Sequence, residues 1–80
     1  MYSRDVLMDW LVEALEDRGG EAHLVQVAES VWERHEEDLR RSGALFFTWQ
    51  YDLRWAALKL RKRGVLRAVD DTRKGVWGLA

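Results

Sequence analysis

The chain has 80 residues, the length of one domain, and 48% of them are hydrophobic, including five tryptophans. It has no cysteine, so neither a disulfide framework nor a thiolate metal site can form. The net charge of −1 hides an asymmetry: residues 1–39 hold eleven acidic and three basic residues (−8), whereas residues 40–80 hold ten basic and three acidic residues (+7). One face is therefore expected to attract a polyanion, unless the two halves simply neutralise each other.

No apolar run approaches the length of a membrane span, and the acidic N-terminal segment does not resemble a signal peptide. We therefore expect a single cytoplasmic domain over residues 1–80, with no membrane partner.

The first predicted helix runs from about Asp5 to Arg18, because its apolar residues recur at helical spacing. Gly19-Gly20 ends it, and residues 21–23 are a candidate short strand. The buried face of this helix should consist of Leu7, Trp10, Leu11, Ala14 and Leu15.

The second predicted helix extends from about Leu24 to Leu39, and its apolar residues again follow the helical period. The sequence Arg41-Ser42-Gly43 should break it. Residues 44–47 (ALFF) then form an apolar connector that we expect to enter the core.

The third predicted helix begins at Thr48, a favourable N-cap, covers residues 49–63 and stops at Gly64. One face carries Trp49, Leu53, Ala56, Ala57 and Leu60. The nearly opposite face carries Tyr51, Trp55 and Leu58, with Tyr51 the aromatic residue expected to stay partly exposed. A helix that is apolar on two sides should be sandwiched between other elements.

The last segment is predicted to be a β-hairpin over residues 65–79. Val65 to Val69 alternates apolar and basic residues, Asp70 to Gly75 forms a polar turn, and Val76 to Leu79 returns as a strand. The fold class is therefore mainly α with a small β-hairpin. Three helices followed by a C-terminal two-stranded wing is the element order of the winged helix-turn-helix.

The third helix and the hairpin together resemble a known family. Residues 53–66 (LRWAALKLRKRGVL) are similar to the Trp-Ala…Leu-Lys-Lys-x-Gly-Leu-Leu segment of the Mrr-type restriction-system N-terminal domain, and residues 73–79 (RKGVWGL) match its basic Gly-Val-Trp-x-Leu strand. The sequence departs from the family at Ala57, where a basic residue is frequent, and at Ala80, where Thr is common. The resemblance implies a winged-helix module that binds DNA, in restriction, phage defence or transcription control.

Double-stranded DNA is accordingly the expected partner, with the third helix in the major groove. Gln50 and Arg54 have side chains suited to adenine and guanine edges. The expected phosphate contacts, made from the end of this helix and from the wing, are Lys59, Arg61, Lys62, Arg67, Arg73 and Lys74.

Each of these assignments has a structural alternative. The polar residues of the third helix can simply solvate it, and the tryptophans at positions 10, 32, 49 and 77 are expected in the core; Trp55 should pack beneath the wing if the resemblance holds. His23 and His35 lack convergent partners in the sequence, so an edge or cap role is expected for both.

A second function class also remains open, namely a protein-interaction adaptor that uses the acidic first two helices or associates head to tail through its charged halves. An enzyme is not expected. The sequence offers no nucleophile–base pair, phosphate loop, metal-ligand set or Asp…Glu-x-Lys nuclease constellation, and it indicates neither a cofactor nor a small-molecule substrate.

Overall fold

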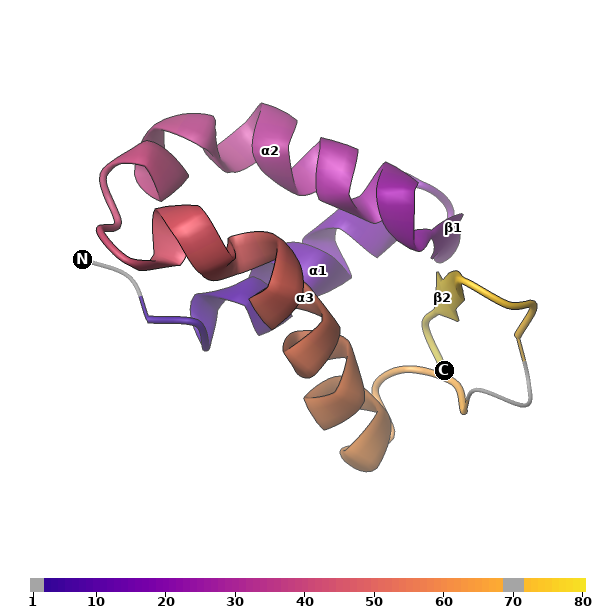
Figure 1. Ribbon diagram of the computed structural model, residues 1–80. Coiled ribbons are helices and arrows are strands. Elements are labelled where there is room, and N and C mark those ends of the chain that lie inside the picture. Colours follow the sequence, from indigo (N-terminus) through magenta and orange to yellow (C-terminus); the bar gives the residue numbers. More distant parts are fainter. Residues whose placement is uncertain (1–2, 69–71) are drawn as a thin grey trace.

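The computed structural model describes residues 3–68 and 72–80, and these residues form three helices and a two-stranded antiparallel sheet (Figure 1). The predicted mainly helical fold with a small sheet is thus confirmed. In chain order the elements are α1 (Val6–Asp17), β1 (Glu21–His23), α2 (Leu24–Arg40), α3 (Leu45–Lys62) and β2 (Val76–Gly78).

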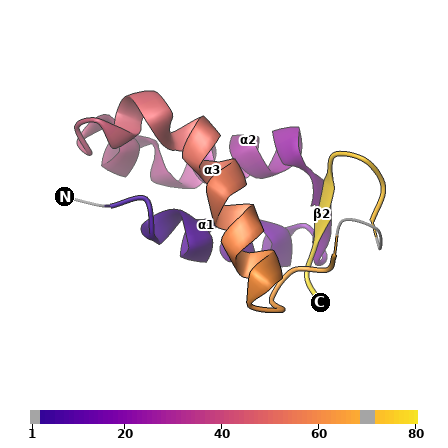
Figure 2. The ribbon, with the colours of Figure 1, turned by 60° about the horizontal axis from the view of Figure 1, so that its bottom comes forward.

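The core is built on α1, which packs against both other helices, and α3 lies across it (Figure 2). The five apolar residues predicted for the buried face of α1 are all buried, as its helical periodicity requires. Trp10, Trp49 and Trp77 are also in the core, and Trp32 is half-buried against it, which confirms the expectation for these four tryptophans.

The first residues of α2 are held by a capping box at His23. The Nδ1 atom of His23 accepts a hydrogen bond from the Val25 N–H at 3.2 Å, and Gln26 Oε1 accepts one from the His23 N–H at 3.1 Å. These bonds satisfy backbone N–H groups that have no partner within the helix. The cap role expected for His23 is confirmed.

The prediction that α3 starts at Thr48 is wrong, because the helix begins three residues earlier at Leu45. Nothing between Gly43 and Thr48 interrupts a helix, so the apolar connector forms its first turn. Thr48 lies inside the helix, and its hydroxyl donates to Asp52 Oδ2 at 2.7 Å. Of the connector, Leu45 is buried, whereas Phe47 is 83% exposed.

The expected sandwiching of α3 between other elements is also wrong. Its first face is buried as predicted, from Trp49 to Leu60. On the other face Leu58 is 48% exposed and Tyr51 is 79% exposed. The exposure of Tyr51 was predicted; of the face to which it belongs, only Trp55 is half-buried against the core, whereas Tyr51 and Leu58 are directed to solvent.

The sheet joins β2 to β1 rather than to the segment that directly follows α3. Ala22 is opposite Trp77 in the register, and the predicted hairpin contributes one bridge, between Leu66 and Leu79. β1 is favoured as the main partner because Ala22 and Trp77 are both buried there. Val69, Asp70 and Asp71, which belong to the predicted hairpin, lie outside the described residues.

Gly75 connects the segment that precedes β2 to the start of α2, because its carbonyl accepts the Leu24 N–H at 2.8 Å. Its φ is +77°, and a Cβ at this position would lie 2.8 Å from His23 Nε2. We expect Gly75→Ala to lower the free energy of unfolding by about 2 kcal/mol, from backbone strain together with this clash.

Urea unfolding followed by circular dichroism would measure this loss. Gly43→Ala is the matched control, since φ is +66° there but no atom lies within 4 Å of the added methyl. The control should lose about 1 kcal/mol from strain alone. Equal losses in the two variants would contradict the role assigned to the His23 contact.

Candidate nucleic-acid interface

The solvent-directed side of α3 carries both apolar and cationic residues. At 3.6 residues per turn, the spacings between these residues keep them within one sector of the helix. All are exposed. We call this sector the outer face of α3; it comprises Phe47, Tyr51, Arg54, Leu58 and Lys62.

Arg4 adds a cation beside the outer face. Its guanidinium carbon lies 4.0 Å from the centroid of the Trp55 ring, in a hollow also lined by Tyr51, Arg54 and Leu58. Trp55 therefore lies against the N-terminal segment and not, as expected, beneath the wing. This cation–π contact fixes a positive charge close to Arg54.

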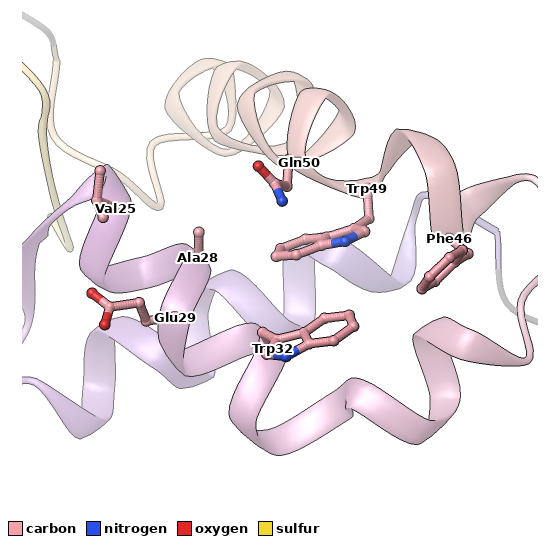
Figure 3. A pocket seen from close by; sticks show the side chains of 7 residues that line it. All are labelled: Val25, Ala28, Glu29, Trp32, Phe46, Trp49 and Gln50. Atoms are coloured by element: carbon pink, nitrogen blue, oxygen red, sulfur yellow. The ribbon is translucent and has the colours of Figure 1, made fainter.

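Gln50 lies to one side of the outer face, over the gap between α2 and α3. Figure 3 shows it above Trp49, with Trp32 and Phe46 closing one end of an apolar hollow. The Trp32 and Trp49 rings stack at 5.9 Å between centroids, and Phe46 lies 6.4 Å from Trp32. The Gln50 amide remains exposed.

A second hollow joins α3 to the sheet. It is lined by Gln50 and Arg54 from α3, Leu24 and Ala28 from α2, and Trp77 from β2, together with Tyr51 and Leu53. The two residues predicted to read bases are thus brought together. They lie next to the first turn of α2.

The cations near the end of α3 are divided between different sides of the helix. Lys62 is exposed on the outer face, and Lys59 Nζ lies 5.8 Å from the Trp55 ring. Arg61 is half-buried, with a buried Nε that has no hydrogen-bond partner among the described residues. Arg63 is directed toward α1, where Nη1 lies 3.5 Å from Met8 Sδ.

Of the three cations that the sequence predicts for a wing, two share a carboxylate on β1. Arg67 Nη2 donates to Glu21 Oε1 at 2.6 Å, and Arg73 Nη2 lies 3.9 Å from Glu21 Oε2. Lys74 is exposed beside them and forms no ion pair with a described residue. Arg67 is therefore largely neutralised within the fold, whereas Lys74 keeps its charge available.

The acidic side of the molecule has its own cluster of paired charges, between α1 and α2. Arg34 bridges Glu13, at 3.3 Å, and Asp17, and His35 Nε2 donates to Glu13 Oε1 at 2.8 Å. The His35 ring also stacks on Trp10 with centroids 3.9 Å apart. The expectation that His35 has no convergent partners is wrong, because helix packing supplies them.

The hydrogen bond from His35, followed by the contacts of Arg34, holds the pKa of Glu13 below its ordinary value of 4.5, although burial acts the other way. Glu13 therefore stabilises the fold above pH 4.5, and this contribution is lost as the pH falls through the lower folded pKa. Between about pH 5.5 and about pH 3, we expect the wild type to lose up to about 1 kcal/mol more unfolding free energy than Glu13→Gln. Urea titrations at both pH values would measure this difference, and equal losses would contradict it.

Several residues of this surface were not predicted as site residues. Phe47 was assigned to the connector, and recognising that α3 starts at Leu45 would have placed it in the helix, four residues before Tyr51 and on the same face. Arg4 carries no sequence signal, because it contacts Trp55, which is 51 positions away in the sequence. The contact by which Glu21 neutralises Arg67 also joins residues that are distant in the sequence, and it depends on the pairing of β1 with β2.

Comparisons with protein-family models, with curated proteins and with solved structures find no match to this chain. The resemblance to the Mrr-type N-terminal domain therefore stays a prediction. Within residues 3–68 and 72–80, no helix has the length and apolar character needed to cross a membrane.

Proposed function

We propose that this domain is a winged helix that binds double-stranded DNA, with α3 in the major groove and residues 65–79 as the wing. The element order and the pairing of β2 with β1 support the fold assignment, as does the Leu66–Leu79 bridge. In this arrangement the second helix of the helix-turn-helix, here α3, presents its N-terminal half to base edges.

The observation that carries the proposal is the state of the cations on α3. Arg54, Lys59, Arg61 and Lys62 form no ion pair with any residue in the described part of the chain. The one carboxylate on this helix, Asp52, accepts a hydrogen bond from Thr48. A helix whose cations are not neutralised within the fold retains them for an external polyanion.

The proposed contacts divide into base readout and positioning. Arg54 and Gln50 face the groove, where arginine pairs with guanine and glutamine with adenine. Lys62, Lys74 and Arg4 are placed to contact phosphates, which orient the protein without reading sequence. Arg67 and Arg73 contribute less, because Glu21 already neutralises part of their charge.

The adaptor alternative would use the acidic residues of α1 and α2, and some of these residues are engaged within the fold. Glu13 and Asp17 bind Arg34, and Glu36 accepts from Arg40 at 2.8 Å. A basic partner would have to displace these pairs, but the other acidic residues of the two helices form no ion pair with a described residue, so the DNA-binding test decides between the two functions; these residues are Asp9, Glu16, Glu29, Glu33 and Glu37.

The proposal is tested by fluorescence anisotropy of a labelled random-sequence duplex, titrated at low and at moderate salt. We expect binding that weakens steeply with salt, since each phosphate contact releases counterions. The double variant Arg54→Ala, Lys74→Ala should bind more weakly and show a shallower salt dependence.

The matched control is the double variant Arg34→Ala, Arg40→Ala, which removes the same net charge from arginines that already have carboxylate partners. It should bind DNA almost as well as the wild type. No binding by a folded sample at low salt would refute the proposal. Equal loss in the two double variants would refute the assigned surface.

A further inference from the structure

The outer face of α3 exposes two large aromatic rings. The DNA contacts proposed above use Gln50 and cationic side chains and give these two rings no role. Phe47 is 83% exposed and Tyr51 is 79% exposed, one helical turn apart in the N-terminal half of α3. Clustered apolar side chains on a surface mark a binding site more often than chance exposure does. This half of α3 is also the part that the proposed function places against base edges.

Phe47 is held by a chain of ring contacts that leads back to the core. Its ring meets Phe46 edge to face, with centroids 5.0 Å apart. Phe46 packs on Trp32, which stacks on the buried Trp49, as Figure 3 shows. A ring positioned in this way loses less conformational freedom on binding than an unsupported side chain.

From this arrangement we propose that Phe47 and Tyr51 contact the C5-methyl groups of thymines in the major groove. The inference rests on the proposed function. The thymine methyl is the one apolar group that base pairs present in that groove, and aromatic side chains can pack on it. Lys62 on the same face and Arg4 beside it supply the charge that complements the DNA backbone, which favours DNA over an apolar protein partner as the occupant.

The spacing of the two rings specifies which thymines they reach. Residues four apart on a helix are separated by about 6 Å along its axis. Bases two steps apart on one strand are separated by about 6.8 Å. The two rings therefore match thymines at alternate positions of one strand, the arrangement found in an alternating adenine–thymine duplex.

The test compares an alternating d(AT) duplex with an alternating d(AU) duplex, which lacks the methyl groups but has the same phosphate charge. The wild type should bind d(AT) about fourfold more tightly for one methyl contact and about fifteenfold for two. Phe47→Ala should reduce this ratio, while its affinity for d(AU) stays near that of the wild type. Val65→Ala, which removes an exposed apolar side chain lying beside α1, should keep the wild-type ratio.

Equal affinity of the wild type for the two duplexes would overturn the inference and leave the proposed function standing. The same conclusion would follow if Phe47→Ala weakened binding to both duplexes equally. Sedimentation of the free protein provides a third outcome: a dimer that Phe47→Ala converts to monomer would assign the rings to an interface between copies. Failure to bind any duplex would instead refute the proposed function.

Discussion

Replacing Arg54 by lysine is expected to reduce sequence preference while largely preserving affinity for random DNA. Arginine contacts guanine through two parallel donors, and lysine keeps the charge but not this planar geometry. On a duplex enriched by the wild type from a random pool, Arg54→Lys should therefore bind tenfold or more weakly. On a random duplex its affinity should stay within about twofold, because the phosphate contacts are unchanged.

Anisotropy titrations on the two duplexes at one salt concentration would measure both quantities. Lys62→Arg is the control, since a phosphate contact needs the charge more than the shape of the cation. It should leave both affinities nearly unchanged. If Arg54→Lys keeps the affinity for the enriched duplex, Arg54 contacts only the backbone.

The second large effect concerns Trp77, the residue that fixes the sheet to the helices. Its side chain is 6% exposed, lies opposite Ala22 in the sheet and also lines the second hollow, which joins α3 to the sheet. Trp77→Ala should lower the free energy of unfolding by about 3 kcal/mol or more. A single core of this size supplies about 3–5 kcal/mol in total, so the variant should be largely unfolded near physiological temperature.

Circular dichroism during urea and thermal unfolding would measure this loss. Phe47→Ala provides the control, because it also removes a large aromatic side chain, but one that is 83% exposed. The control should stay within about 0.5 kcal/mol of the wild type. A small loss in Trp77→Ala would mean that the sheet contributes little to holding the fold together.

The local parts of this fold were predictable from the sequence. Periodicity gave the buried face of α1, the limits of α2 to within one residue and the buried face of α3. The N-cap preference of Thr48 led to an error, because a polar residue can also bond within a helix, here to Asp52. The N-cap preference of Thr48 favoured a helix start at this residue, whereas the residues before it were equally compatible with a helix. Residue propensity alone could not decide between these two starting points.

The candidate site depended on contacts between distant residues, which no local pattern contains. Arg67 was predicted as a DNA contact, and only the pairing of β1 with β2 places Glu21 beside it. The His35 cluster depends on a local kink in α2, where φ is −125° and ψ is 21°. Charge balance along the chain therefore predicted the presence of a basic surface, but not which cations remain unpaired on it.

The pairing of β1 with β2 also has a consequence for biosynthesis. The register joins Glu21 to Gly78, so the sheet cannot form until nearly all of the 80 residues have been synthesised. During translation the helices emerge first, while the places that Trp77 will occupy beside Ala22 and Leu24 remain open to water. Such a late, non-local contact slows folding and leaves apolar surface exposed in the nascent chain. A nascent chain that stops before Val76 would therefore lack β2 and be a ready substrate for proteolysis.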